Sequence, residues 1–463
     1  MPIFHRPQLL PTILAFAGLF LAGVSLWSQR MFGDVSFEQF VYHTRFGLSG
    51  LLQTDTDSIH LFLVYAVLLP LLAALACTVL WLRAQWLLLP AGVALFLLHF
   101  SFGTYVASLF GPDLFASYYV SPASVQLLAN GRPRSLVIIY VESLESTYQD
   151  STRFGRDLLA PLTQLQQRYA RFVHYPQMAG AHWTMAGIIA TQCGIPLKIS
   201  ILPSPDDHSL HLRRFLPGAL CLGDVLKAQG YQNVFLNGPD LSFADMGVFL
   251  KEHGYDRVYG AREWELAGEP HSQLHNWGLR DDQLLRHARS ELAALIATGK
   301  PFNLTILTVD THGPKGLMSQ ECRKRGAQDF KDIVRCTAGQ VAEFVQYIEA
   351  QGWLDRVAVV VQGDHMAMEN PIHDSLEASP TRDIFNLMVT QPVATPSTDT
   401  VTHFDLYPTL LELAGLRPQN GRMGLGWCAL QSCQAASAPG QRIADFKAGI
   451  LNRSPIYEQL WLP

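Results

Sequence analysis

Three long apolar segments near the N-terminus constrain this chain more than any other feature of its sequence. They run from about Leu9 to Trp27, from about Ile59 to Leu82, and from about Trp86 to Phe100 or on to Phe110. A helix needs roughly 20 apolar residues to cross a bilayer, so the first two segments are long enough, and the third is long enough with its extension. The sequence therefore predicts a membrane region with about three transmembrane helices in residues 1–110.

The first apolar segment has two alternative interpretations. A buried helix of a soluble protein rarely runs so far without a polar face, and this segment carries no charged residue. A cleaved signal peptide is the stronger rival, although residues 26–29 offer no small-x-small cleavage site. Arg6 and Arg83 favour a cytoplasmic N-terminus and second loop by the positive-inside rule, so three spans would place the large C-terminal part outside the inner membrane.

Length and charge bound the rest of the chain. With 463 residues it has room for a membrane part and a catalytic part. Its hydrophobic content of 49% is high for a soluble enzyme, and the excess lies near the N-terminus. The net charge is -5 and no long Lys/Arg run occurs, which argues against nucleic acid as a partner because phosphate binding needs clustered basic residues.

The seven cysteines indicate an oxidising compartment. Cys77 lies inside the second apolar segment. The other six fall in sequence-order pairs: Cys193 with Cys221, Cys322 with Cys336, and Cys428 with Cys433. An even number in an exported domain indicates disulfides. A zinc site is the competing interpretation, and the absence of any Cys-x-x-Cys motif makes it a poor one.

Four segments follow from composition. Residues 32–58 mix aromatic and charged side chains, which suits either an amphipathic segment in the outer interface or an ordinary ordered loop. Residues 111–134 contain three prolines and are interpreted as a linker. Residues 135–435 are expected to form the catalytic domain, and residues 436–463 a C-terminal tail.

Downstream of the linker, apolar runs alternate with helical stretches. Strands are expected at Ser135–Tyr140, Val234–Leu236, Asn303–Val309, Val357–Val361 and Phe385–Thr390. Helices are expected at Leu158–Tyr169, Thr184–Gln192, Leu222–Gln229, Asp281–Ala297, Gly339–Gln351 and Asp405–Ala414, with Asp405 as the cap of the last and Pro408 in its first turn. Near-continuous apolar strands separated by helices predict an α/β/α domain with a mostly parallel sheet covered on both faces.

Polar residues follow three of the expected strands. Glu142 follows the first, Asp310 and His312 follow the third, and Asp364 and His365 follow the fourth. Ligands of open α/β sheets bind outside the carboxyl ends of the strands, so we expect these side chains to converge at one edge. Carboxylate oxygen with imidazole nitrogen suits Mn²⁺ or Zn²⁺ and, less well, Mg²⁺. A Gly-Asp-His triplet alone would be weak evidence, because such residues also cap turns.

Thr184 and His312 each have a structural and a chemical interpretation. Thr184 opens a helix, so it is either a plain N-cap or a hydroxyl nucleophile that a metal activates. A helix N-terminus also favours an incoming phosphate. His312 is either a surface histidine in a Gly-Pro turn or a general acid that protonates a leaving alkoxide.

Seven stretches together carry a family resemblance. They are Tyr140–Tyr148, Trp183–Leu197, Cys221–Gly238, Val248–Gly260, Asn276–Asp282, Leu307–Pro314 and Gln362–Met368. In this order they resemble the alkaline phosphatase/sulfatase superfamily and, within it, the branch of lipoteichoic acid synthases and phosphoglycerol transferases. The resemblance covers most of Ser135–Glu369, and the ensemble is far more specific than any single stretch.

The resemblance implies roles for individual residues. Glu142, Asp364 and His365, with Thr184, match the metal ligands of the family. Thr184 also matches the nucleophile that becomes covalently modified, and His312 matches a histidine near the phosphate. Trp277 and Asp281 lie in a stretch that the resemblance places near the site, and with Asp310 at the strand end they are the candidate substrate contacts. Four cysteines match half-cystine positions of the family: Cys193, Cys221, Cys322 and Cys336.

The resemblance also implies an activity. The expected enzyme moves glycerol phosphate from phosphatidylglycerol to a periplasmic glucan hydroxyl, with one divalent ion, Mn²⁺ before Mg²⁺ or Zn²⁺, from a multi-pass position in a bacterial inner membrane. The alternatives are a phosphoethanolamine transferase acting on a surface glycolipid and a polymerase like lipoteichoic acid synthase. A formylglycine sulfatase is disfavoured because no Cys-x-Pro-x-Arg occurs. A non-catalytic binding protein is disfavoured because nucleophile and ligands are all present.

Overall fold

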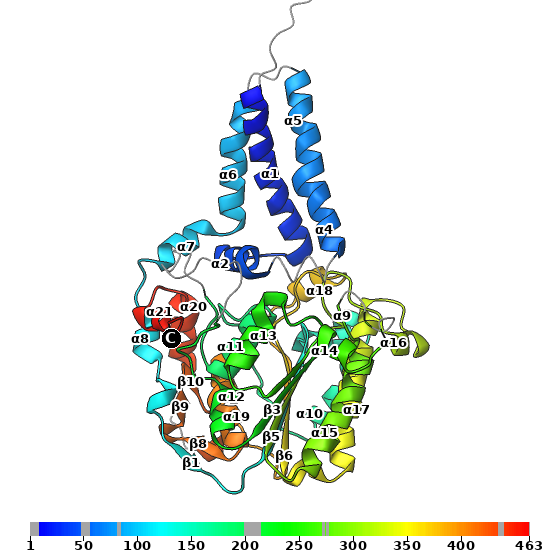
Figure 1. Cartoon of the computed structure of the whole chain (residues 1–463), viewed down its shortest axis with the longest axis vertical. Helices are drawn as coiled ribbons and strands as arrows, with labels where there is room; N and C mark the ends of the chain where they lie inside the picture. The colour runs from blue at the N-terminus through cyan, green and yellow to red at the C-terminus, as the bar shows by residue number, and fades with distance from the viewer. Residues whose placement is uncertain are drawn as a thin grey trace, which may run out of the picture.

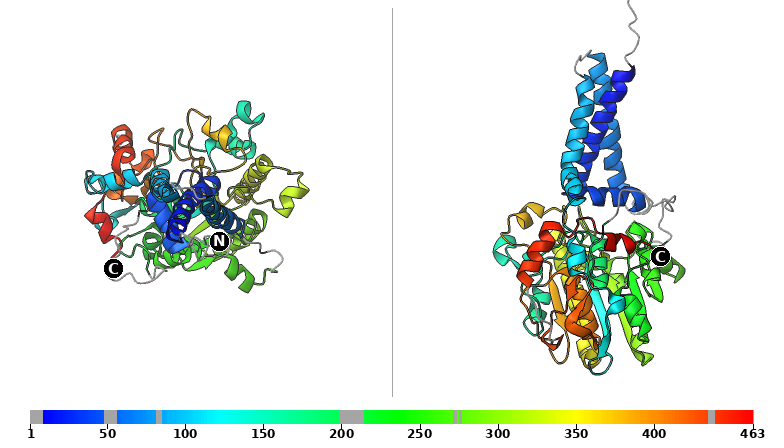
Figure 2. Two further views of the ribbon diagram at one scale, coloured as in Figure 1. Left: turned by 90° about the horizontal axis from the view of Figure 1, so that it is seen from above. Right: turned by 90° about the vertical axis from the view of Figure 1, so that its left-hand side faces the viewer.

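The computed structural model describes residues 9–47, 56–80, 85–198, 214–270, 274, 277–433 and 439–462. An apolar helical bundle stands on one end of a larger α/β domain (Figures 1 and 2). The predicted boundary between domain and tail, at residues 435 and 436, lies outside the described residues. All of the predicted site residues lie within them.

Two helices of the bundle are long and apolar enough to cross a membrane. The first is α1 (Leu9–Phe32), and the second runs through Ser58–Val79, formed by α4 (Thr56–Phe62), η2 (Leu63–Leu68) and α5 (Leu69–Val79). The third predicted span is bent by 59° between Gln85–His99, which contains α6 (Leu88–His99), and α7 (Phe102–Ser108). The bend falls at Ser101, whose φ of 52° leaves the helical region.

Small residues let α1 and α6 approach closely. A Cβ atom at Gly18 would lie 2.0 Å from the carbonyl oxygen of Leu88, and one at Gly92 would lie 2.0 Å from that of Gly18. Within a bilayer, apolar side chains gain little free energy by moving from lipid into a helix interface, because both environments are apolar. Close packing of the backbones, as seen here, is therefore what holds such helices together.

A short helix, α2 (Phe37–Tyr42), lies across the base of the bundle (Figure 1). It falls within the segment 32–58 whose role the sequence leaves open. Phe40 packs on Phe100 of the bundle at a ring distance of 4.3 Å. Tyr42 is 2% exposed and belongs to the core of the α/β domain. This helix therefore bridges the two parts of the chain.

The α/β domain is built on a six-stranded sheet with the order β4-β3-β5-β2-β6-β7. Its strands are β2 (Ser135–Val141), β3 (Gln232–Asn237), β4 (Arg257–Tyr259), β5 (Phe302–Leu307), β6 (Val357–Gly363) and β7 (Asn386–Val389). All neighbours pair in parallel except β6 and β7. The mostly parallel sheet is as predicted, and β4 is an edge strand that the sequence analysis did not identify.

Helices cover both faces of the sheet. Alternate residues of β2 belong to two separate apolar cores, one lined by Leu136 and the other by Val137. The first core packs under α11 (Thr184–Cys193), α12 (Leu222–Ala228) and α19 (His403–Leu413), and the second under α10 (Ala160–Gln166), α15 (Asp281–Ala297) and α17 (Phe330–Ala350) (Figure 1). Burial on both faces explains why the strands are continuous apolar runs.

Two helix starts differ from the sequence expectation. Helix α17 begins at Phe330, nine residues before the predicted Gly339, because the Asp329 side chain caps it by accepting from the Asp332 N–H. Helix α19 is capped by Thr402, with Asp405 at the third helical position of a capping box, so Asp405 is not the N-cap and Pro408 lies in the second turn.

The C-terminal residues 439–462 pack on the domain. Helices α20 (Pro439–Gly449) and α21 (Pro455–Gln459) lie beside α8 (Leu114–Tyr118), a helix within the predicted linker (Figure 1). Phe446 and Tyr457 are 0% and 3% exposed. The segment predicted as a tail thus contributes to the first apolar core.

The six cysteines downstream of the bundle form three disulfides, Cys193–Cys221, Cys322–Cys336 and Cys428–Cys433. The first joins the end of α11 to the start of α12, and the second joins α16 (Gln320–Lys324) to α17. The bonded cysteines are separated by 28, 14 and 5 residues respectively.

Loop length predicts unequal effects of removing these bonds. Loop-closure entropy gives a stabilisation of about 3.6 kcal/mol for the 28-residue separation and about 2.1 kcal/mol for the 5-residue one. The double variant Cys193→Ala/Cys221→Ala should therefore lower the thermal unfolding midpoint more than Cys428→Ala/Cys433→Ala does. Tryptophan fluorescence of the protein in detergent measures both midpoints. The reverse order would contradict the entropic ranking.

Candidate active site

The carboxyl edge of the sheet brings together Glu142, Asp364 and His365. Val141 pairs with Gly363 at the ends of β2 and β6, so the residues that follow are neighbours. His365 Nε2 lies 3.4 Å from Glu142 Oε1 and 3.5 Å from Asp364 Oδ2. All three side chains are buried, and their ligand atoms lie within 4.8 Å of one another. The convergence expected from the strand ends is present in the structure.

Backbone geometry orients the two carboxylates. Ser143 has a φ of 56°, an uncommon conformation for a residue other than glycine. In this conformation its N–H donates to Asp364 Oδ1 at 2.8 Å, and its hydroxyl donates to Glu142 Oε1 at 2.7 Å. The His365 N–H also donates to Asp364 Oδ1, at 2.9 Å. Strained backbone of this kind is common where side chains must be held for function.

The cluster has the charge and the free atoms of a cation site. Burial, followed by the neighbouring Glu142 carboxylate, raises the pKa of Asp364 to about 7. Asp364 Oδ2 is buried without a hydrogen-bond partner. His365 Nδ1 donates to the carbonyl oxygen of Met366 at 2.7 Å, which leaves the Nε2 lone pair directed at the carboxylates. The residues therefore fit a divalent metal ion.

Thr184 lies beside this cluster at the start of α11. It is the first helical residue, and the N-cap position belongs to Trp183, so the plain N-cap interpretation does not hold. Its Oγ1 donates to Glu142 Oε2 at 3.4 Å. Gly187 permits this approach, because a Cβ atom there would lie 2.0 Å from the carbonyl oxygen of Asp364.

The loop that carries His312 is tied to the same strand end. Thr311 Oγ1 donates to the Glu142 carbonyl oxygen at 2.5 Å, and the Glu142 N–H donates to Thr308 Oγ1 at 3.1 Å. The half-buried His312 ring lies 4.2 Å from that of Trp277. His312 and Trp277 are therefore in contact, and the loop that carries His312 is hydrogen-bonded to Glu142 of the cluster.

Asp281 and Asp310, two of the predicted substrate contacts, lie inside the protein. Both are 0% exposed. Asp281 accepts from the N–H groups of Val309 and Asp310 at 2.7 Å and 3.2 Å, and from Thr337 Oγ1 at 3.0 Å. Its carboxylate therefore holds the start of the His312 loop from within the protein. Spacing along the chain could not distinguish such a support from a substrate contact.

The structure adds two histidines to the surroundings of the cluster. Burial, followed by proximity to His365, lowers the pKa of His182 to about 4 and that of His403 to about 3, so both are neutral. Both ring nitrogens of His403 are buried without a partner. His403 is the first residue of α19, two residues before the predicted start of this helix, and periodicity does not distinguish a helix residue that faces a site from one that faces the core.

A buried ion pair supports the loop after His365. Glu145 is 0% exposed and pairs with Arg382, and it accepts from the Ala367 N–H at 3.1 Å. Removing one partner of such a pair leaves an uncompensated buried charge. The sequence offered no signal for this contact, because the two residues are more than 200 positions apart.

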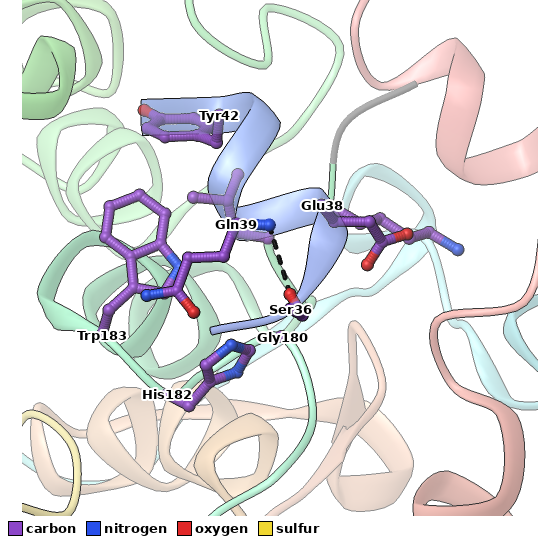
Figure 3. A pocket seen from close by; sticks show the side chains of 9 residues that line it. Ser36, Glu38, Gln39, Tyr42, Gly180, His182 and Trp183 are labelled. Atoms are coloured by element: carbon purple, nitrogen blue, oxygen red, sulfur yellow. Dashed lines mark hydrogen bonds between the residues drawn. The ribbon is translucent and has the colours of Figure 1, made fainter. Parts of the chain in front are cut away.

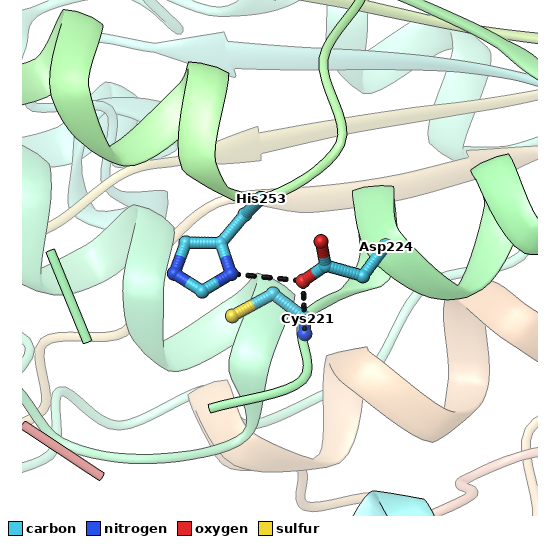
Figure 4. A group of neighbouring side chains, drawn as sticks. All are labelled: Cys221, Asp224 and His253. Atoms are coloured by element: carbon cyan, nitrogen blue, oxygen red, sulfur yellow. Dashed lines mark hydrogen bonds and ion pairs between the residues drawn. The ribbon is translucent and has the colours of Figure 1, made fainter. Parts of the chain in front are cut away.

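A second group of potential ligands, Cys221, Asp224 and His253, has a structural role (Figure 4). Cys221 is bonded to Cys193 and offers no thiolate. His253 Nδ1 lies 2.8 Å from Asp224 Oδ2, and its Nε2 lies 2.9 Å from the carbonyl oxygen of Phe215. With both ring nitrogens engaged, the group ties three segments together and is not a second metal site.

Comparisons with known proteins agree with this geometry. The family model for sulfatases matches residues 134–416, which include all the residues of the cluster. Phosphoglycerol transferase I of Salmonella paratyphi B and that of Salmonella typhimurium are each 40% identical over 283 residues, 60% of this chain and 36% of theirs. The match thus spans about a third of the length of these curated relatives.

One solved structure extends the comparison to the fold. The lipoteichoic acid synthase LtaP from Listeria monocytogenes superposes with a TM-score of 0.50 at 16% identity, covering 65% of this chain and 78% of that one. At this identity the likeness concerns the fold alone.

Removing one carboxylate should reduce metal binding. Asp364→Asn should weaken Mn²⁺ affinity by on the order of 100-fold, because one anionic ligand is lost from a buried site. Isothermal titration of chelator-treated protein measures this. Asp374→Asn, an exposed Asp on α18 (His373–Glu377), is the matched control and should bind as the unmodified protein does. Equal affinities for all three proteins would refute the site.

Asp281 should matter for stability and turnover together. Asp281→Ala leaves three buried donors without an acceptor, which should cost about 2–3 kcal/mol and slow turnover by loosening the His312 loop. Urea denaturation measures the first effect, and an activity assay in detergent measures the second. Asp282→Ala, one residue further along α15, should change stability by no more than about 0.5 kcal/mol. A stable, fully active Asp281→Ala protein would show that the loop needs no such support.

Proposed function

The chain belongs to the sulfatase family, and from that membership we propose that it is a membrane-anchored phosphoglycerol transferase. It moves glycerol phosphate from phosphatidylglycerol to a hydroxyl of a periplasmic glucan through a covalent intermediate on Thr184. The observation that carries the proposal is the position of Thr184 Oγ1, which donates to a carboxylate of the buried acidic and histidine cluster. The 40% identity to proteins named phosphoglycerol transferase I supports the choice of transferred group.

Four residues would hold the metal ion: Glu142, Asp364, His365 and Thr184. Their mixture of oxygen and nitrogen donors suits Mn²⁺, the expected ion, with Zn²⁺ and, less well, Mg²⁺ as alternatives. When bound, a divalent ion supplies positive charge that lowers the pKa of the threonine hydroxyl and offsets charge developing on the phosphate oxygens.

The reaction proceeds in two displacements. Thr184 loses its hydroxyl proton along the hydrogen bond to Glu142 Oε2, and its Oγ1 bonds to phosphorus while the bond from phosphorus to the diacylglycerol oxygen breaks. An acceptor hydroxyl then attacks the phosphorus and gives its proton to the imidazole of His312, which has donated its own proton to the first leaving group. The bond from phosphorus to Thr184 breaks, and Glu142 returns a proton to Thr184 Oγ1, which restores the threonine hydroxyl.

His312 provides the proton for the first leaving group. Its Nδ1 is 2.7 Å from the carbonyl oxygen of Gly313, so this nitrogen carries a hydrogen and the opposite nitrogen faces away from the backbone. From its protonated form, Nε2 donates to the departing diacylglycerol oxygen. Trp277, in ring contact with His312, holds the imidazole in this orientation and contacts the substrate.

The membrane region keeps the enzyme at its lipid substrate. Residues 1–110 anchor the chain in the inner membrane, residues 111–134 link to a catalytic domain of residues 135–435 in the periplasm, and residues 436–463 follow. The three disulfides support an oxidising compartment. Confinement to the bilayer surface raises the effective concentration of the donor.

The nucleophile can be tested directly. Thr184→Ala should abolish diacylglycerol release from fluorescent phosphatidylglycerol, while the thermal midpoint stays within a few degrees of the unmodified protein, because only one weak hydrogen bond is lost. Mass spectrometry of the unmodified protein with donor and without acceptor should find glycerol phosphate on Thr184. Thr298→Ala, at the far end of α15, is the control and should keep full activity. Turnover by Thr184→Ala close to that of the unmodified protein would disprove the assignment.

The donor is distinguished by a second assay. The unmodified protein, given phosphatidylglycerol and phosphatidylethanolamine separately, should release diacylglycerol from the first. Release from the ethanolamine lipid alone would move the protein to the phosphoethanolamine transferases.

A further inference from the structure

A narrow pocket lies between α2 and the loop that leads into the nucleophile helix (Figure 3). It is lined by Ser36, Glu38, Gln39, Tyr42, Gly180, His182, Trp183, Leu197 and Lys198. The walls leave room for one group of the size of a water molecule or a hydroxyl. The pocket therefore combines residues of the membrane-proximal segment with the two residues that precede Thr184.

Aromatic contacts hold α2 over this loop. The Tyr42 ring lies 4.7 Å from the Trp183 ring, and the His43 ring lies 4.6 Å from the Trp183 ring. Tyr42 also donates its buried hydroxyl to the carbonyl oxygen of Ala244 at 2.8 Å. These contacts make α2 a wall of the active-site region.

Gln39 presents an unused acceptor to the pocket. Its side chain is 5% exposed, and its Oε1 is buried with no hydrogen-bond partner. Figure 3 shows its amide turned toward the same space as Trp183 and His182. A buried polar atom without a partner is costly, and in native proteins it commonly marks a site that a ligand or water completes.

The charges around the pocket favour a neutral ligand group. Lys198 is 7% exposed, donates to the carbonyl oxygen of Asn452 at 2.6 Å, and lies on the Tyr457 ring with its Nζ 4.7 Å from the centroid. Burial raises the pKa of the half-buried Glu38 to about 7, while Lys198 acts in the opposite direction. Among the described residues that line the pocket, Glu38 is the one carboxylate, and the buried cation Lys198 lies beside it. This arrangement disfavours an ammonium group in the pocket, so a ligand would be recognised there by hydrogen bonding.

The pocket lies on the side of the α/β domain that faces the helical bundle. Helix α2 is at the base of the bundle, between the membrane-spanning helices and the α/β domain (Figure 1). From there the chain of contacts runs through Trp183 to Thr184. A head group that leaves the bilayer surface for the nucleophile passes this wall before a glycan from the periplasm would.

We propose that this pocket receives a free hydroxyl of the polyol head group of the donor lipid, with Gln39 Oε1 as the hydrogen-bond acceptor. The inference rests on the proposed function, since it concerns the donor side of that reaction. It makes the membrane-proximal helix a specificity element for the head group.

Gln39→Met tests this, because methionine keeps the shape of the side chain and removes the acceptor. Diacylglycerol release from phosphatidylglycerol is measured in mixed micelles without acceptor. Losing one buried hydrogen bond should raise KM for the lipid about five- to tenfold and change kcat by less than twofold. Gln39→Glu, which keeps an acceptor oxygen, should show a smaller rise in KM, and Gln29→Met, at an exposed position of α1, should show none.

The outcomes separate the two proposals. A KM for phosphatidylglycerol that is unchanged in Gln39→Met would overturn the pocket assignment. So would a rise in KM that affects only a polyol acceptor added in a second series of assays. Neither result would contradict the proposed transferase activity. If the unmodified protein releases no diacylglycerol from phosphatidylglycerol, the proposed function fails, and the inference fails with it. If Gln39→Met does not elute as a folded protein, Gln39→Glu is compared with the unmodified protein instead. KM values that are equal for these two proteins, on phosphatidylglycerol and on phosphatidylethanolamine, would then count against the pocket.

Discussion

Two buried carboxylates, Glu142 and Asp364, stand next to each other because β2 and β6 pair in parallel and end at the same level. Like charges in a low-dielectric interior repel, and the raised pKa of Asp364 reflects both burial and that repulsion. The surrounding structure offsets the cost with the N–H groups of Ser143 and His365, and leaves room for a cation. The strained Ser143 follows from this requirement, as does the glycine at position 187 where α11 meets Asp364.

The same strand end organises the rest of the site. The backbone of Glu142 is bonded on both sides by the loop that carries His312, and its side chain accepts from Thr184. Asp281 fixes that loop from the core side. Beyond it, ring contacts continue from His312 to Trp277, Phe243 and His43, which links the chemistry to the membrane-proximal segment. The histidine loop and the segment that follows α2 are therefore joined by packed rings.

Local sequence was a good guide where one element decides the outcome by itself. The continuous apolar runs at Ser135–Tyr140 and Val357–Val361 are strands because both faces of a covered parallel sheet are apolar, and the polar residues that follow them had to lie at its carboxyl edge. The same reasoning failed at α19, whose cap is Thr402, because Thr and Asp three residues apart can each serve as a cap. It also did not indicate that Asp281 is buried and accepts hydrogen bonds from the start of the His312 loop.

By itself, the sequence determined the apolar segments, five of the six strands of the main sheet, and the strand ends that carry Glu142, Asp364 and His365, since each depends on hydrophobic periodicity over a few consecutive residues. Only the tertiary structure decided which distant groups meet: the pairing of Glu145 with Arg382, the placement of His182 and His403 near His365, and the docking of α2 against Trp183. Each of these contacts joins residues of different elements, outside the few consecutive residues over which hydrophobic periodicity acts. Their energies depend on burial and orientation, which exist only once the sheet and its covering helices have packed together.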